Sequence, residues 1–202
     1  MSLKKITDAQ EHLVQELYTK DLTGPSIASR LNISVKQVYD SLRRQGIPRK
    51  SLLERNRQRF FEKPLSFVFK EEYSSEERDL LVAGLMLYYG EGAKTGNTVD
   101  FANSDPMLLL VFLKFLRIIC GIEEKKLRFY LYCFSDQESE SLITFWCSHL
   151  GVQRRQFTKP YVRSTLNRGK RTMKYGVLHI RYSDKRLLEK ILSLGRDLAS
   201  TL

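Results

Sequence analysis

The sequence predicts an α+β protein, with a small helical module at its start and a larger domain that combines helices with a mixed or antiparallel sheet. Three observations support this prediction. Apolar residues recur at helical spacing over much of the chain, four short segments are rich in β-branched and aromatic residues, and two strongly basic segments flank a more acidic middle. A chain of 202 residues is long enough for one ordinary domain plus a small one.

The expected elements follow from these patterns. The N-terminal module covers residues 1–48, a basic linker covers residues 49–75, and the larger domain covers residues 76–202. Helices are expected at about residues 8–20, 24–31, 34–45, 76–90, 105–120, 137–149 and 184–195. Strands are expected at Thr98–Ala102, Leu127–Phe134, Gln156–Val162 and Tyr175–Tyr182.

The chain carries a large positive charge. It has 34 Lys+Arg against 23 Asp+Glu, which gives a formal net charge of +11 and a pI of about 9.6. Such a surplus favours a polyanionic partner, either nucleic acid or an anionic membrane surface. The longest apolar run, Met107 to Leu113, is too short to cross a bilayer, and the polar segment 1–10 does not resemble a secretory signal. We therefore expect a nucleic-acid partner, no membrane partner, and a cytoplasmic location that is associated with the nucleoid if the source is prokaryotic.

The cysteines do not indicate a metal site. Cys120, Cys133 and Cys147 are spaced 13 and 14 residues apart, which matches no zinc-binding pattern. We expect them to be small buried hydrophobic residues in a reducing compartment.

The segment 24–39 has the features of two helices joined by a tight turn. Pro25 suits the first turn of a helix, because its missing N–H would be unpaired there in any case. Ser34 suits the N-cap of the next helix, whose buried stripe would be formed by Val35, Val38 and Leu42. This pattern resembles the helix-turn-helix motif of DNA-binding proteins. The alternative is a plain three-helix bundle whose polar face is only solvated.

The resemblance implies that the helix after Ser34 enters the major groove of DNA with its N-terminal residues near the base edges. Lys36 and Gln37 are then the expected base contacts, and Arg43 and Arg44 are expected to contact phosphates. The expected DNA-binding residues of the module are Ser34, Lys36, Gln37, Tyr39, Arg43 and Arg44.

A second motif covers Leu80 to Lys94. There an apolar helix with small residues runs into Gly90-Glu91-Gly92 and then towards a strand. This segment resembles the LAGLIDADG homing-endonuclease family, in the variant that ends in Gly-Glu-Gly. A looser resemblance extends over residues 77–196, where two strand-then-helix segments fall at 99–119 and 177–192. The resemblance implies a LAGLIDADG-like α/β domain after the helix-turn-helix module.

The same resemblance implies an active site at Glu91. In this family a carboxylate at that position holds Mg²⁺, and a hard cation of this kind polarises a phosphate and activates water. Because the chain has one copy of the motif, two chains would have to pair as a C₂ homodimer to supply two such acids. Asn103 and Arg181 fall near the positions of a polar and a basic residue beside the scissile phosphate. The expected catalytic residues are therefore Glu91, Asn103 and Arg181, with Glu91 as the metal ligand.

A simpler interpretation stays open for each of these three residues. Glu91 would be an exposed acid after a helix that Gly90 caps, and Asn103 and Arg181 would be structural. One departure from the family pattern concerns the small Ala83-Gly84 pair. It lies two residues earlier than in the family motif, and Leu85 and Met86 occupy the usual positions.

The segment 151–183 is basic and free of acids. It holds nine Lys and Arg residues, and Tyr161 and Tyr175 flank its most basic part. A strand–loop–strand with this charge would neutralise many phosphates and make binding strongly salt-dependent. The expected DNA contacts in this segment are Arg163, Arg168, Lys170, Arg171 and Lys174.

Three functions fit this sequence. The first is a sequence-specific, Mg²⁺-dependent DNA endonuclease that acts as a homodimer on double-stranded DNA, and the presence of Glu91 favours it. The second is a catalytically silent transcriptional regulator on the same fold, which the shifted small residues favour. The third is an RNA-binding maturase, because maturases of this family assist intron splicing.

Overall fold

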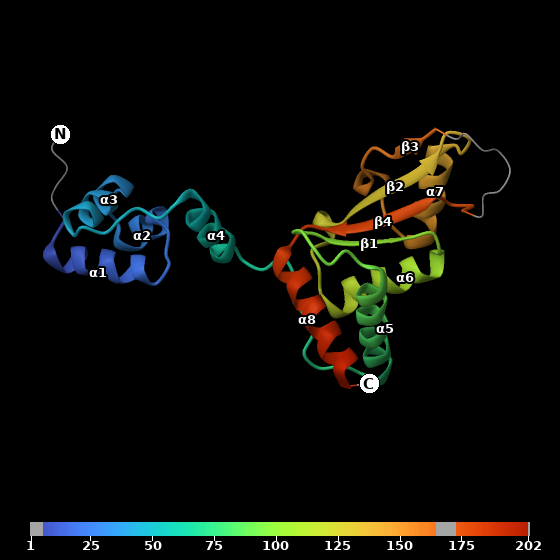
Figure 1. The fold of residues 1–202 in the computed structure, drawn as a ribbon, viewed down its shortest axis with the longest axis horizontal. Helices are drawn as coiled ribbons and strands as arrows, with labels where there is room; N and C mark the ends of the chain where they lie inside the picture. Colours follow the sequence, from blue (N-terminus) through green and yellow to red (C-terminus); the bar gives the residue numbers. More distant parts are fainter. Residues whose placement is uncertain (1–5, 165–172, 202) are drawn as a thin grey trace. The chain divides into compact units, whose positions relative to one another are not determined.

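The structure is a computed structural model that describes residues 6–164 and 173–201. The chain divides into two compact units, Met1–Leu65 and Ser66–Leu202, and each has its own hydrophobic core. Figure 1 shows the elements of both units. The expected α+β class is confirmed, because the described residues form eight α-helices and one four-stranded sheet.

The N-terminal unit is helical throughout. Its described elements are α1 (Asp8–Thr19), α2 (Gly24–Leu31), α3 (Val35–Arg44) and α4 (Leu52–Glu62). The first three pack around a small core formed by Ile6, Val14, Tyr18, Ile27, Ala28, Val38 and Leu42. A short turn joins α2 to α3, and its residue Asn32 has the left-handed conformation at φ 50° that commonly ends a helix. The three expected helices of this module therefore form close to their expected bounds.

The segment 49–75, expected to be a linker, has structure of its own. Its first part forms α4, which a reciprocal cap between Ser51 and Glu54 starts. At the other end of α4, the Glu62 carboxylate accepts a hydrogen bond from the Thr23 backbone N–H at 2.8 Å, so α4 is fastened to the start of α2. Its later part belongs to the second unit, where Phe67 forms a β-bridge with Ile122.

The second unit is a sheet with helices packed on one face. Its helices are α5 (Ser75–Glu91), α6 (Pro106–Lys114), α7 (Ser139–Leu150) and α8 (Lys185–Thr201). Its strands are β1 (Val99–Asn103), β2 (Arg128–Phe134), β3 (Tyr161–Arg163) and β4 (Val177–Tyr182). The strand order is β1-β4-β2-β3, with β2 and β3 parallel and the other neighbours antiparallel. The sheet is therefore mixed, which is one of the two forms that the sequence predicted.

Two elements differ from their expected form. The expected helix at 105–120 is continuous, but its last turn, Phe115–Ile119, is a π-helix. The expected strand Gln156–Val162 is reduced to Tyr161–Arg163, because Arg154–Gln156 forms a 3₁₀ turn and Pro160 has no N–H to donate to a neighbouring strand.

The core lies between the sheet and its helices. In β1, β2 and β4 alternate residues are buried, and the residues between them are only half-buried or exposed. Phe101, Phe129, Leu131, Cys133, Leu178 and Ile180 are fully buried on the side of the helices. Cys120 and Cys133 are buried free thiols, as expected, while Cys147 is half-buried. None of the described helices of this unit covers the opposite face of the sheet, which is called the open face below.

Candidate nucleic-acid surface and acidic corner

Glu91 and Asn103 come together at one corner of the second unit. Glu91 is the last residue of α5 and is exposed, and Asn103 is the last residue of β1. The Asn103 Nδ2 group donates a hydrogen bond to Glu91 Oε2. The Asn103 Oδ1 atom accepts one from the Asp105 backbone N–H at 2.8 Å, which orients the amide. Two of the three expected catalytic residues are therefore in direct contact.

The Gly-Glu-Gly turn has a local reason for its shape. After α5 the chain turns back on Tyr88, whose hydroxyl donates to the Ala93 carbonyl at 2.6 Å. The Ala93 N–H then donates to the Asp100 carbonyl at 2.9 Å, which joins the turn to β1. A Cβ at Gly92 would lie 2.4 Å from the Tyr88 ring, so a side chain there would not fit. The turn thus fixes Glu91 beside the end of β1.

Arg181, the third expected catalytic residue, has other partners. It lies on β4, where its Nε donates to Asp100 Oδ2 at 2.8 Å. The other oxygen of Asp100 pairs with His179 Nδ1, also at 2.8 Å. Burial alone would raise the pKa of Asp100, but His179 and Arg181 outweigh it and hold that pKa below its ordinary value. In the described contacts Arg181 is thus a partner of Asp100 and not of Glu91.

The described residues around Glu91 offer few side-chain ligands for a metal ion. Within residues 6–164 and 173–201, no three His, Cys, Asp or Glu side chains are close enough to hold a metal ion together. Glu91 offers one carboxylate, and Asp105 caps α6 by accepting from the Met107 N–H at 2.7 Å. Mg²⁺ usually keeps several waters and takes one or two carboxylates together with phosphate oxygens, so Glu91 would supply one such ligand.

The small residue Gly84 is used for packing inside the unit. It is buried on α5, and a Cβ added there would lie 2.1 Å from the Phe115 ring. This close approach lets α5 pack on the π-turn that follows α6. In this chain the shifted Ala83-Gly84 pair thus brings two elements of one unit together.

In the N-terminal unit, the start of α3 is held by two of the expected DNA-binding residues. Ser34 and Gln37 form a reciprocal cap, in which the Gln37 side-chain oxygen accepts from the Ser34 N–H at 2.8 Å and Ser34 Oγ accepts from the Gln37 N–H at 3.2 Å. The oxygen of Gln37 that was expected to face a base therefore faces the backbone of its own helix. Lys36, the other expected base contact, is exposed.

The remaining expected residues of α3 contact their own unit. The Tyr39 ring lies against Gly24, and the Arg49 guanidinium lies over that ring, 4.5 Å from its centroid. Arg43 pairs with Asp40 at 3.2 Å and stays largely exposed. Arg44 donates through Nε to Glu11 at 3.0 Å, which ties the end of α3 to α1. Arg43 and Lys36 are thus the more accessible cations of α3.

The open face of the sheet gathers aromatic and basic side chains. The register pairs Asp100 with Arg181, Tyr130 with His179 and Tyr132 with Tyr161, so all of these side chains share one face. By the same alternation this face consists of Asp100, Ala102, Arg128, Tyr130, Tyr132, Phe134, Tyr161, Arg163, Val177, His179 and Arg181.

The sequence prediction did not include Arg128, Tyr130 and Tyr132 among the site residues. The sequence feature that could have indicated these residues is the alternation in Arg128–Phe134, where every second residue is apolar and buried. The alternation separates two faces, but it does not tell which face the helices cover.

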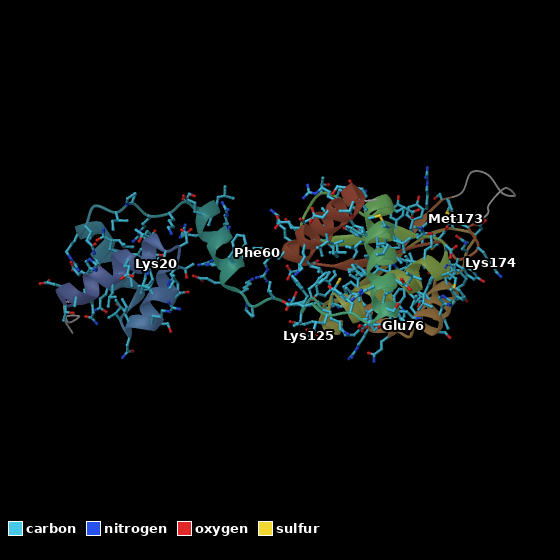
Figure 2. The ribbon with its side chains drawn as sticks, turned by 90° about the horizontal axis from the view of Figure 1, so that it is seen from below. Lys20, Phe60, Glu76, Lys125, Met173 and Lys174 are labelled. Carbon is cyan, nitrogen blue, oxygen red and sulfur yellow. The ribbon has the colours of Figure 1, made fainter. Side chains whose placement is uncertain are left out.

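The expected contacts of the segment 151–183 are partly within the described chain. Arg163 is exposed at the end of β3 and donates through Nη1 to the Tyr132 hydroxyl at 3.4 Å. Met173 and Lys174, labelled in Figure 2, come just before β4, and the Lys174 ammonium lies 5.1 Å from the centroid of the Tyr175 ring. Arg168, Lys170 and Arg171 lie outside the described residues.

The helices of the described chain are all either too short or too polar to cross a lipid bilayer. Comparisons with family models, with curated proteins and with solved structures gave no match for this chain.

Proposed function

We propose that this chain is a sequence-specific protein for double-stranded DNA, in which α3 contacts bases and the open face of the sheet contacts phosphates. The observation that carries the proposal is the open sheet face, where Arg128, Arg163 and Arg181 stand on one side of three neighbouring strands. Asp100 is the one carboxylate among the described strand residues of this face, and it is paired with a histidine and an arginine. Such a surface attracts a polyanion.

The N-terminal unit supports the proposal with an exposed lysine on its third helix. Lys36 lies in the first turn of α3, where a side chain can reach base edges if the helix enters the major groove. The reciprocal cap keeps the Gln37 oxygen on the helix backbone, so Lys36 is the better candidate for base contact. Arg43 follows two turns later on the same helix and suits a phosphate.

The test compares sequence preference with overall affinity. Wild-type protein is used to select a preferred duplex from a random library, and binding to selected and scrambled duplexes is then measured for each variant. Lys36→Ala should weaken binding to the selected duplex by about 1–3 kcal/mol and relax the preference. Lys20→Ala is the matched control, because Lys20 is an exposed lysine of the same unit, directly after α1 (Figure 2). Equal losses on selected and scrambled DNA would exclude Lys36 as a base contact.

The contact between Glu91 and Asn103 favours a second candidate function, hydrolysis of the bound DNA. It brings a carboxylate and an amide to one exposed corner, as the resemblance to LAGLIDADG endonucleases predicts. In this candidate Glu91 would hold Mg²⁺ together with waters and phosphate oxygens, and a second copy of the chain would supply the second carboxylate that the resemblance implies.

Glu91→Gln tests hydrolysis, because it keeps the shape of the side chain and removes its charge. Wild-type protein should nick or cut DNA from its native locus with Mg²⁺, and Glu91→Gln should abolish cutting while DNA binding survives. Wild-type protein that binds this DNA specifically but leaves it intact would exclude hydrolysis and leave the silent regulator. A Glu91→Gln variant that cuts normally would exclude Glu91 as the catalytic acid.

A further inference from the structure

Two tyrosines form a stack at the open edge of the sheet. The Tyr132 and Tyr161 rings lie 5.1 Å apart between centroids, at an interplanar angle of 26°. Tyr132 belongs to β2 and Tyr161 to the edge strand β3, and the register places them side by side on the open face. Tyr161 remains 49% exposed although it is a large ring. The stack therefore ends in a ring that is accessible to another flat group.

Two arginines lie close to these rings. Arg163, two residues after Tyr161 on the same face, donates to the Tyr132 hydroxyl. Tyr130, Tyr132, Tyr161 and Arg163 together line a shallow depression of about 390 Å³. On its other side the Arg181 guanidinium lies over the Tyr130 ring, 4.7 Å from the centroid. A ligand of this depression would thus meet aromatic rings and positive charge together.

This combination matches the chemistry of an unpaired nucleotide. A base in a duplex presents only its edges, because both of its faces are stacked on neighbouring pairs. An unpaired base offers a free face to an aromatic side chain, and its phosphate can pair with a nearby arginine. Tyr161 lies on the edge strand β3, where such a base could reach its ring.

We propose that the Tyr132–Tyr161 stack binds unpaired bases of single-stranded nucleic acid, with Arg163 on an adjoining phosphate. The site extends the proposed function from paired DNA to DNA with an unpaired segment, or to RNA. It is independent of base reading by α3, since it involves other residues in the other unit.

The experiment separates stacking from charge. Binding of the full chain is measured at fixed salt by fluorescence anisotropy, with a short single strand and with an abasic strand of equal length. The abasic strand keeps the phosphates and lacks the bases. The variants are Tyr161→Ala, Tyr161→Phe, which keeps the ring, and Val162→Ala as matched control. Val162 is 47% exposed on the same edge strand and points to the opposite side of the sheet.

Tyr161→Ala should lower affinity for the base-containing strand by roughly 5- to 150-fold and leave the abasic strand unaffected. Tyr161→Phe and Val162→Ala should bind as wild type does. Equal losses on both strands, or a Phe variant as weak as the Ala variant, would overturn the proposal. Wild-type protein that does not distinguish the two strands would also overturn it, whether or not the variants fold.

Binding of DNA and RNA strands of the same sequence is measured in parallel. The strand whose affinity falls more on Tyr161→Ala shows whether the site takes unpaired bases of DNA or of RNA. The fully paired duplex of the Lys36 test is included in the same series. If Tyr161→Ala does not weaken single-strand binding while the Lys36-dependent duplex preference is intact, only the single-strand site is refuted. The reverse result refutes only the proposed duplex function.

Discussion

Gln37 helps to cap the N-terminus of its own helix, α3. Its side-chain oxygen and the Ser34 hydroxyl satisfy each other's backbone N–H groups at the start of α3. Gln37→Ala removes the hydrogen bond from the Ser34 N–H to the Gln37 oxygen and should therefore destabilise the N-terminal unit by about 0.5–1.5 kcal/mol, the net worth of one such bond. Because the one tryptophan, Trp146, belongs to the second unit, its fluorescence follows that unit alone, whereas far-ultraviolet circular dichroism follows both.

Gln37→Ala should lower the melting temperature of the N-terminal helices, followed by circular dichroism. The melting temperature of the second unit, followed by Trp146 fluorescence, should stay at the wild-type value. Lys36→Ala, one residue earlier and exposed, is the control that should leave both transitions unchanged. A Gln37→Ala protein of wild-type stability would indicate that the Gln37 oxygen contributes nothing to the cap, and would return Gln37 to the candidate base contacts.

Asp184 makes the second unit sensitive to acid. It is 5% exposed and accepts a hydrogen bond from Ser66 Oγ at 2.7 Å, which fastens the chain before α5 to the end of β4. Burial alone would raise the pKa of Asp184, but hydrogen bonds from Ser66 and Arg186 outweigh it and lower that pKa. A folded-state pKa below the unfolded value means that the carboxylate stabilises the fold above the unfolded pKa of about 3.9. This stabilisation is lost as pH falls further.

Asp184→Asn keeps the shape of the side chain and removes its titration. The difference in free energy of unfolding between wild type and Asp184→Asn should be largest at neutral pH and should shrink as the pH falls below about 4. Urea unfolding followed by Trp146 fluorescence measures it. A difference that stays constant from neutral to acidic pH would show that the Asp184 charge does not contribute.

At the scale of the element, α5 contains two glycines in opposite surroundings. A Cβ at Gly84 would meet the Phe115 ring at 2.1 Å, whereas a Cβ at Gly90 would meet no atom within 4 Å. Gly84→Ala should therefore destabilise the second unit by about 1–3 kcal/mol, as overpacking does. Gly90→Ala on the same helix should be neutral or stabilise by up to about 1 kcal/mol, since alanine favours helices. Thermal unfolding of both variants tests this, and equal effects would contradict the close packing of α5 on Phe115.

The sequence predicted most elements because their signals are local. Ser34 is a helix cap that the sequence itself identifies, and the alternation in Arg128–Phe134 indicates a strand without further information. The helix α4 was missed because it buries no apolar stripe: Leu52, Leu53 and Phe61 are all exposed, and the segment looks like a charged linker. Its place depends on the contact between Glu62 and Thr23, which are distant in sequence.

The candidate site divides in the same way. Glu91 and Asn103 are twelve residues apart, on consecutive elements α5 and β1, so the sequence motif that contains Glu91 could also indicate Asn103. The partner of Arg181 is Asp100 on another strand, and the open face of Tyr130 and Tyr132 depends on the side that the helices cover. Both depend on strand order and packing, which local patterns do not determine.

At the scale of the whole molecule, basic residues are present in both units. Lys36 and Arg43 are accessible in the N-terminal unit, and Arg163 and Lys174 are exposed in the second. Two linked binding modules bind one DNA molecule more tightly than either module alone, because the second module binds at a high effective concentration. In the proposed function α3 contacts bases and the sheet contacts phosphates, so both units should contact DNA in the same complex.

The salt dependence of binding tests this requirement. Each phosphate that a cation neutralises releases condensed counterions, so the slope of log affinity against log salt grows by about 0.9 for each such contact on duplex DNA. The whole chain should have a steeper slope than either fragment, 1–65 or 66–202, each of which contains its own core. Fragment 1–65 should keep the sequence preference at lower affinity, and fragment 66–202 should bind duplexes without a sequence preference.

Arg163→Ala in the whole chain should reduce the slope by about 0.9 and weaken binding to all duplexes alike. A whole-chain slope equal to that of fragment 1–65 would mean that the sheet does not contact the phosphates of duplex DNA.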